Sequence, residues 1–261
     1  MFRAQDRIEI KTVDQIQAMR AAGLVVARTL QRVAEITKAG ITTAEMDDRA
    51  AQSILDEGAT PSFLGYHGFP AHICVSVNEE VVHGIPGPRR LADGDVVSID
   101  CGAIVDGWHG DAAITVLVGD VAPELVELSR VTEESLWAGL AAARPGHRLS
   151  DIGHAVERCI RGQGAQYGIV EEYVGHGIGT RMHMEPPVPN YGRPGRGPRL
   201  VPGMALAVEP MVVLGDAGVH TLDDDWTVVA SDGSHASHWE HTVAVTDEGP
   251  WVLTALDDVR L

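Results

Sequence analysis

The sequence predicts an α+β fold of two similar halves, in which largely antiparallel strands are covered by helices. Short turns between the strands and two internal repeats lead to this prediction. The first repeat, at an offset of 106 residues, relates Gly40, Ile54, Gly58 and Ala59 to Gly146, Ile160, Gly164 and Ala165. The second, at an offset of 109, relates Leu91-x-x-Gly94-x5-Asp100 to Leu200-x-x-Gly203-x5-Glu209. We therefore expect one domain, residues 1–261, with halves of roughly 12–118 and 122–246.

The first half is expected to begin with two helices. Thr12 and Gln15 fit a capping box, which marks a helix start. Apolar residues then follow at helical spacing, namely Ile16, Met19, Gly23, Val26, Leu30 and Val33. Lys38-Ala39-Gly40 supplies a cation and a glycine, which predict the end of this helix. A second helix is expected from about Thr42-Thr43-Ala44-Glu45 to Gly58.

The second half repeats this order. Pro123-Glu124 fits a helix start, and periodic apolar positions continue to Arg144-Pro145-Gly146. A further helix, with Ser150 as its predicted N-cap, is expected to run to about Gly162–Gly164. Strands are expected to follow the helices in each half, so the repeat places Asp100 and Glu209 at equivalent points.

A predicted hairpin brings two carboxylates together. Residues 96–105 and 112–118 are strand-like, and Asp106-Gly107 between them favours a two-residue type I′ turn. That turn pairs Asp100 with Ala113 and Asp111 with Gly102, so both carboxylates lie on one face as diagonal neighbours. Two such close negative charges suggest a bound cation. The alternative is the solvated polar face of an edge hairpin.

The second half contains further candidate ligands. His176 lies in Gly175-His176-Gly177-Ile178-Gly179, where glycines allow a close approach of the backbone, although a lone histidine there can be an ordinary loop residue. Glu209 interrupts an apolar strand, residues 204–213, and Glu240 interrupts another, residues 238–245. A buried carboxylate needs a partner or a metal. For Glu209 the alternative is an edge strand with the side chain in solvent, which Pro210 favours.

Together these side chains form an oxygen-rich set with one nitrogen. Two Asp, two Glu and one His suit two hard or borderline divalent ions, such as Mn, Fe, Co or Zn. Two ions about 3.5–4 Å apart are suited to the hydrolysis of amides or phosphates.

Composition excludes several classes of protein. Hydrophobic residues are 44% and charged residues 22%, close to the globular average, which argues against a disordered chain. No apolar stretch approaches the about 20 residues of a membrane span, and residues 1–7 lack the apolar core of a signal peptide. The net charge of −17 argues against nucleic acid as the main partner. Three separated cysteines without a Cys-x-x-Cys pair fit reduced thiols, and we expect a cytoplasmic protein.

Taken in order, these motifs resemble those of the type I methionine aminopeptidases. The motifs are Asp100 with Asp111 eleven residues on, Gly175-His176-Gly177-Ile178-Gly179, Val208-Glu209-Pro210-Met211 and Trp239-Glu240-His241-Thr242. The resemblance covers essentially the whole chain. It implies the pita-bread fold, with two pseudo-symmetric halves around a dinuclear metal site. It also implies removal of the initiator methionine from nascent polypeptide N-termini whose second residue is small.

The resemblance assigns roles to individual residues. Asp100 and Asp111 would hold one of two divalent ions (Co, Mn, Fe, Zn or Ni), His176 and Glu209 the other, and Glu240 would bridge both. Glu209 would also act as the general base.

The same resemblance implies a substrate pocket. His83, in Val82-His83-Gly84-Ile85-Pro86, would contact the scissile amide and the amine end of the substrate. His183, in Met182-His183-Met184-Glu185-Pro186, would stabilise the carbonyl oxygen. Four residues would line the pocket for the methionine side chain: Tyr66, Phe69, Cys74 and Trp226. Without the resemblance, ordinary core packing would account for the aromatic residues among them.

The chain departs from the family pattern at two positions. Met182 stands where the family often has Phe, and Phe63 stands where some relatives carry Cys, so the rim of the pocket is expected to differ. His67, His72, His109, His235 and His238 fall outside the motifs and are expected at the surface or behind the ligands.

Two alternative functions remain open from the sequence. One is a prolidase or aminopeptidase P-type peptidase, although such enzymes usually carry an extra N-terminal domain. The other is a non-catalytic peptide-binding relative, although such proteins lose metal ligands. The resemblance further implies a monomer that acts at the ribosome, with no nucleic-acid site of its own and no membrane partner.

Overall fold

A computed structural model describes residues 8–163 and 167–261. Two expectations from the sequence involve residues outside these ranges. The argument against a signal peptide rests on residues 1–7, and the first repeat includes Gly164 and Ala165. The helices are α1 (Val13–Ala34), α2 (Thr43–Asp56), α3 (Pro123–Ala142) and α4 (Leu149–Arg161), with a short 3₁₀ turn, η1 (Tyr66–Gly68). Within these ranges, no helix has the length and apolar content needed to cross a membrane.

Fifteen strands form three antiparallel sheets in the described chain. The main sheet has the order β1-β4-β5-β14-β9-β7-β8, with β2 paired to β4 and β15 paired to β14. Its strands are β1 (Thr60–Pro61), β2 (Ile73–Val77), β4 (Val96–Val105), β5 (Trp108–Leu117), β7 (Gly175–Gly177), β8 (Met184–Val188), β9 (Ala205–Val208), β14 (Glu240–Thr246) and β15 (Gly249–Val252). The small sheets contain β3 (Glu80–Val82), β6 (Gly168–Ile169), β10 (Met211–Val213), β11 (Val219–Thr221), β12 (Val228–Ala230) and β13 (Ala236–His238). The predicted α+β class with antiparallel strands is confirmed.

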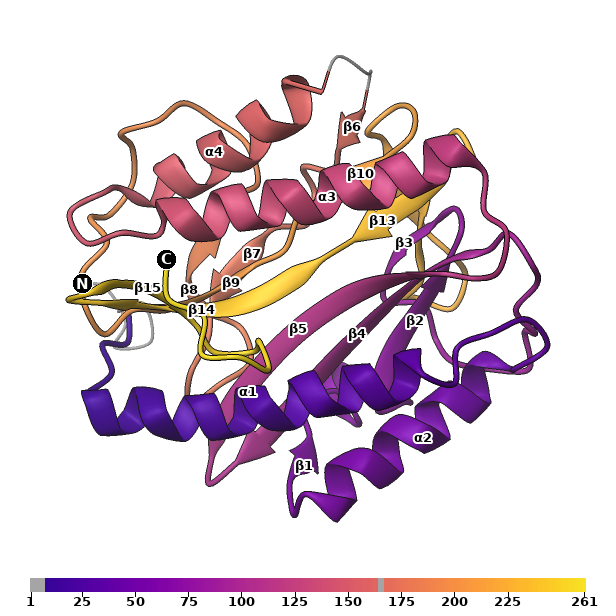
Figure 1. The fold of residues 1–261 in the computed structure, drawn as a ribbon, viewed down its shortest axis with the longest axis horizontal. Helices are drawn as coiled ribbons and strands as arrows, with labels where there is room; N and C mark the ends of the chain where they lie inside the picture. The colour runs from indigo at the N-terminus through magenta and orange to yellow at the C-terminus, as the bar shows by residue number, and fades with distance from the viewer. Residues whose placement is uncertain (1–7, 164–166) are drawn as a thin grey trace.

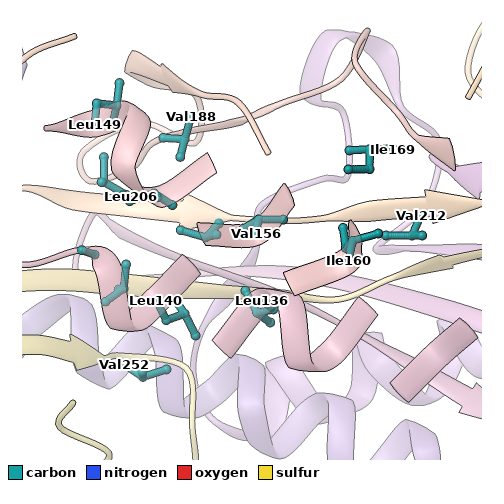
Figure 2. Packing of buried hydrophobic residues seen from close by; sticks show 14 of the residues in the cluster. Leu136, Leu140, Leu149, Val156, Ile160, Ile169, Val188, Leu206, Val212 and Val252 are labelled. Atoms are coloured by element: carbon teal, nitrogen blue, oxygen red, sulfur yellow. The ribbon is translucent and has the colours of Figure 1, made fainter. Parts of the chain in front are cut away.

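Two helix pairs cover the main sheet, one over each half (Figure 1). Helix α1 lies over β4 and β5, with α2 beside it against β1 and β2. Helix α3 lies against β9 and β14, with α4 beside it against β8. Figure 2 shows the second of these layers, where Leu136 and Leu140 of α3 and Val156 of α4 pack with Leu206 of β9. The helices thus bury one face of the sheet and leave the other face for a cavity.

The internal repeat has a counterpart in hydrogen bonds. In the first half the Gly40 amide donates to the Leu91 carbonyl at 2.7 Å, and in the second the Gly146 amide donates to the Leu200 carbonyl at 2.9 Å. Both glycines have positive φ, 94° and 84°. Each half therefore joins its helix pair to its strands in the same way, as expected for a duplicated motif.

The structure confirms the predicted start of the first helix and corrects its predicted end. The Thr12–Gln15 capping box is present. The predicted end of α1 at Gly40 is wrong, because α1 stops at Ala34 and the Thr37 hydroxyl donates to the Val33 carbonyl at 2.8 Å. That local bond competes with continued helix, and Gly40 serves the turn before α2.

The predicted N-cap of α4 is also wrong. Arg148, not Ser150, occupies this position, and its amide donates to the Asp151 carboxylate at 2.8 Å. The Ser150 hydroxyl instead accepts a hydrogen bond from the Arg196 amide at 2.7 Å, which ties the following loop to the helix.

Two predicted long strands are each divided in the structure. Residues 204–213 form β9 and β10 in different sheets, with Glu209 and Pro210 between them. Residues 238–245 are interrupted at Trp239, between β13 and β14. Proline has no amide hydrogen to donate to a neighbouring strand, so Pro210 interrupts the strand. The chain changes sheet at this point, directly after Glu209.

Candidate metal centre

The register of the main sheet places the candidate ligands in two adjacent rows. The predicted hairpin register is confirmed, with Asp100 opposite Ala113 and Asp111 opposite Gly102. Ala113 in turn pairs with Glu240 of β14. Asp100, Ala113 and Glu240 therefore share one face, because directly opposite residues in antiparallel strands point to the same side. The short alanine side chain leaves space between the two carboxylates.

The second row contains Asp111 and His176. The Thr242 hydroxyl on β14 donates to the Asp111 carbonyl at 2.8 Å, Thr242 pairs with Ala207 of β9, and Ala207 pairs with His176 of β7. Glu209 directly follows β9. Strands from both halves thus supply the set, with β14 as the link between them.

Strand β9 lies inside the sheet, between β14 and β7. The edge-strand alternative for Glu209 is therefore wrong, and its side chain is only 14% exposed. Pro210 ends the strand without placing it at an edge.

The ligand atoms converge in a buried space. The His176 Nε2 atom lies 3.7 Å from an Asp111 oxygen and 3.6 Å from a Glu209 oxygen. Single ligand atoms of Asp111, His176 and Glu240 all lie within 4.8 Å of one another. Asp100 and Glu209 line the same cavity. These distances are short enough for several of the side chains to share one ion.

Backbone packing fixes the orientation of His176. Its Nδ1 atom lies 3.0 Å from the Gly177 carbonyl, which leaves Nε2 directed at the carboxylates. A Cβ atom on Gly177 would lie 2.2 Å from the Glu185 carbonyl oxygen, and one on Gly175 would lie 2.3 Å from that of Ala207. The glycines on both sides of the histidine are therefore needed for close packing with β8 and β9.

Electrostatics favours a cation at this place. Burial raises the pKa of Asp100 to about 7. Burial and the neighbouring negative charges also hold the pKa values of the other three carboxyls, Asp111, Glu209 and Glu240, well above their usual range. Burial lowers the pKa of His176 to about 3, which keeps its imidazole neutral. One oxygen on each of Asp100, Asp111 and Glu240 is buried without a hydrogen-bond partner among the described residues. This donor set fits divalent ions, which would supply the missing partners.

An aromatic wall adjoins the carboxylates. The cavity, of about 120 Å³, is lined by all eleven residues predicted for the site, together with Phe63. The rings of Phe69 and Trp226 meet edge to face with centroids 5.1 Å apart. Cys74 is buried, and it pairs with Asp100 across strands β2 and β4. The cavity therefore combines a polar end with an apolar, sulfur-containing end.

The two departures from the family pattern lie in different surroundings. Phe63 is among the lining residues. Met182 is buried outside this lining, and its terminal methyl lies against Gly102. Only Phe63 therefore changes the wall of the cavity directly.

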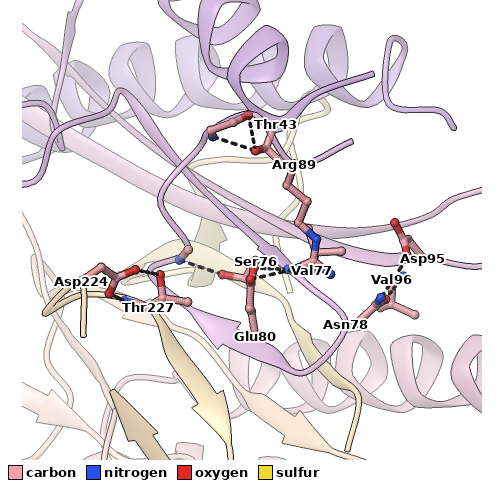
Figure 3. A network of polar contacts seen from close by, with 12 residues as sticks. Thr43, Ser76, Val77, Asn78, Glu80, Arg89, Asp95, Val96, Asp224 and Thr227 are labelled. Carbon is pink, nitrogen blue, oxygen red and sulfur yellow. Dashed lines mark hydrogen bonds and ion pairs between the residues drawn. The ribbon is translucent and has the colours of Figure 1, made fainter. Parts of the chain in front are cut away.

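A polar network supports the segments that carry His83 and Trp226 (Figure 3). The Glu80 carboxylate accepts from the Val77 amide and pairs with Arg89, each at 2.8 Å. Asp224 accepts hydrogen bonds from the Trp226 amide and from Thr227. His83 itself has a positive φ of 61°, a conformation that is costly without glycine and is often found at functional sites.

Two further buried residues contact a site side chain or the loop beside the site, although their sequence context does not single them out. His238 is buried, and its Nε2 atom lies 3.8 Å from the Glu209 oxygen other than the one near His176. Lys11 is buried beside the loop between the two site histidines, and its Nζ atom donates to the Ile178 carbonyl at 2.6 Å. Only their burial in the folded chain reveals both, since each is a single polar residue without a motif.

The fold and this arrangement of carboxylates and imidazole together define a metallopeptidase. The profile of metallopeptidase family M24 matches residues 17–247. The chain is 53% identical to methionine aminopeptidase 1 of Mycobacterium tuberculosis, over 97% of each chain. It is 51% identical to methionine aminopeptidase 1 of Bacillus subtilis, over 94% of this chain and 98% of that relative. The chain belongs to metallopeptidase family M24 and, within it, to the methionine aminopeptidases.

Solved structures agree with this membership. The methionine aminopeptidase from Rickettsia prowazekii superposes with a TM-score of 0.93 at 39% identity, over 95% of this chain and all of that chain. The expected pita-bread fold is thereby confirmed. A prolidase from Pyrococcus furiosus has a TM-score of 0.75 at 21% identity and is covered to 66% of its length, a likeness that shows the fold alone.

Proposed function

We propose that this chain hydrolyses the peptide bond after an N-terminal methionine, and that it prefers substrates with a small second residue. The observation that carries the proposal is the single cavity in which a buried carboxylate–imidazole cluster meets an aromatic wall. A thioether is polarisable and packs well against aromatic rings and sulfur, so Tyr66, Phe69, Cys74 and Trp226 are suited to the methionine side chain. Relatives with high identity over nearly the whole chain are named methionine aminopeptidases.

We further propose that five residues hold two divalent ions, drawn from Co, Mn, Fe, Zn and Ni. Asp100 and Asp111 would hold one ion, His176 and Glu209 the other, and Glu240 would bridge both. When bound, such ions lower the pKa of water and polarise the carbonyl group of the substrate. The unpartnered buried oxygens support this assignment, because an apolar surrounding without a cation would leave them unsatisfied.

Three protein side chains transfer the proton or form hydrogen bonds to the substrate. Glu209 accepts a proton from the attacking water and delivers it to the leaving amine. His183 donates a hydrogen bond to the carbonyl oxygen as negative charge develops there. His83 contacts the scissile amide and the amine end, and burial lowers its pKa to about 4, so its imidazole is neutral at pH 7.

We infer that the substrates are nascent polypeptide N-termini met at the ribosome in the cytoplasm, and that the chain acts as a monomeric single domain. The support for this inference is the resemblance to the methionine aminopeptidases, and the experiment below tests the activity on which it depends.

A release assay tests the proposed function. Peptides Met-Ala-Ser, Met-Leu-Ser and Ala-Pro should be compared with and without each added metal. Metal-dependent release of methionine from Met-Ala-Ser, with much slower release from Met-Leu-Ser, is the expected result. Cleavage of Ala-Pro in preference to both would favour a prolidase-type peptidase and overturn the proposal.

A further inference from the structure

Tyr66 and His183 form a contact pair at the rim of the cavity. The Tyr66 hydroxyl lies 2.9 Å from the Nδ1 atom of His183. The two rings also stack, with centroids 5.3 Å apart and an interplanar angle of 25°. The residues come from η1 and from the turn before β8, 117 positions apart in the chain. Tyr66 therefore contacts one ring nitrogen of His183, and the other nitrogen makes no hydrogen bond within residues 8–163 and 167–261.

Both partners of this contact are held in place. On one side, the amide of Phe69 donates to the Tyr66 carbonyl at 2.9 Å, which closes the tight turn of η1. On the other side, the ring of His176 lies 4.2 Å from that of His183, centroid to centroid. The imidazole of His183 thus lies between Tyr66 and a candidate metal ligand, with limited freedom to turn.

The direction of the hydrogen bond follows from the ordinary chemistry of the two groups. A phenol hydroxyl is a good donor, and a neutral imidazole has one donor nitrogen and one acceptor nitrogen. With the hydroxyl 2.9 Å from Nδ1, the favourable arrangement is that Tyr66 donates and Nδ1 accepts. The remaining proton of His183 then belongs on Nε2.

We propose that Tyr66 is a positioning residue that fixes the tautomer of His183, in addition to lining the pocket. With Nδ1 occupied as an acceptor, Nε2–H is presented to the cavity as a donor. This inference rests on the proposed function only for the use of that donor, namely the hydrogen bond to the carbonyl oxygen of the substrate. The tautomer itself is a property of the protein without substrate.

The experiment uses Tyr66→Phe, which removes the hydroxyl and retains the ring. Nitrogen-15 spectra of the histidine side chains, recorded on protein loaded with diamagnetic zinc, report which nitrogen is protonated. A His183→Asn variant assigns the signal. We expect Nε2–H in the original protein and a mixture of tautomers in Tyr66→Phe. In parallel, kcat for Met-Ala-Ser should fall about two- to ten-fold, the effect of one neutral hydrogen bond, with little change in KM.

Tyr173→Phe is the matched control. Tyr173 lies against the other rim histidine, His83, with ring centroids 5.4 Å apart. In the part of the chain that the structure describes, its hydroxyl makes no hydrogen bond to a histidine. Loss of this hydroxyl should change neither the His183 tautomer nor kcat.

Specific results would overturn the proposal. One is a proton on Nδ1 of His183 in the original protein, because Tyr66 would then accept rather than donate. Another is a Tyr66→Phe spectrum identical to that of the original protein, even if kcat falls, because the hydroxyl would then act only through packing. If the original protein released no methionine, the proposed function would fail while the spectra still decided the tautomer.

Discussion

Removal of the metals should make the stability of this protein depend on pH in an unusual direction. Between pH 6.5 and 8.5, the free energy of unfolding of the metal-free protein should fall as the pH rises. The cause is the group of four buried carboxyls, Asp100, Asp111, Glu209 and Glu240, whose pKa values are raised in the folded state. The folded chain retains protons that the unfolded chain has lost, so rising pH favours unfolding.

The size of the effect follows from the number of retained protons. Each extra proton in the folded state contributes a slope of about 1.4 kcal/mol per pH unit. Asp100, with a pKa of about 7, loses its proton across the lower part of the interval. Burial and neighbouring negative charges also raise the pKa values of the other three carboxyls. Each proton that the folded chain keeps over the whole interval adds a loss of about 2.7 kcal/mol over two pH units, a large fraction of a typical stability of about 5–15 kcal/mol.

Buried histidines oppose the carboxyl effect in the lower part of this interval. Burial lowers the pKa of His176 and that of His238 to about 3, so both are neutral in the folded state. An unfolded histidine, with a pKa of about 6.5, still takes up protons below about pH 7.5. The carboxyl effect is therefore clearest from pH 7.5 to 8.5, and measurements in acid would mix two opposite slopes.

Urea unfolding followed by tryptophan fluorescence provides the assay. Samples with a chelator should lose stability from pH 6.5 to 8.5, whereas metal-loaded samples should be more stable, because ions bind the folded state by mass action. Asp111→Asn should stabilise the metal-free form at pH 8.5 and flatten its slope, since one carboxyl whose pKa is raised by folding is gone. The same variant should lose metal and most activity. A metal-free protein whose stability is constant or increases from pH 7.5 to 8.5, where histidines are neutral in both states, would refute the reasoning.

Three further predictions concern individual side chains. His183→Ala should keep its metal content by elemental analysis and lose about 10²–10³-fold in turnover, the usual effect of one lost oxyanion donor, whereas His176→Ala should lose both; loss of metal in His183→Ala would contradict this. Gly23→Ala should destabilise the fold by at least about 1–3 kcal/mol, because its Cβ would lie 2.1 Å from the Leu253 carbonyl oxygen; an unchanged Tm would exclude that clash. Lys11→Met should speed hydrogen exchange at residues 178–182, since its ammonium holds a carbonyl there, and unchanged exchange would show that this bond is dispensable.

Local sequence signals were sufficient for part of this structure. Asp106 and Gly107 both adopt positive φ, as the predicted type I′ turn requires, and this turn alone sets the register of Asp100 against Asp111. The Thr12 and Thr42 capping boxes were equally predictable, because all of their partners lie within three residues. Such features depend on short-range geometry, which the order of residues specifies directly.

Features that depend on distant segments were not predictable in this way. The divided strands at Pro210 and Trp239 arise because their two parts pair with different sheets, a choice made by partners elsewhere in the chain. His238 and Lys11 acquire their positions through burial against Glu209 and Ile178 respectively. No periodicity in the sequence records such contacts.

The pairing of β14 also determines which donor atoms face the proposed metal site. Glu240 faces the carboxylates, while the next residue, His241, faces the helical side and bonds Thr254 there, with 2.8 Å between Nδ1 and Oγ1. A slip of one residue would exchange the two, replacing an oxygen donor by an imidazole. The set would then contain two imidazoles and three carboxylates, and more nitrogen donors favour metals such as copper. Thr242, bonded through its hydroxyl to the backbone of Asp111, opposes that slip. The Thr242 hydroxyl thereby helps to keep Glu240, rather than His241, among the proposed ligands.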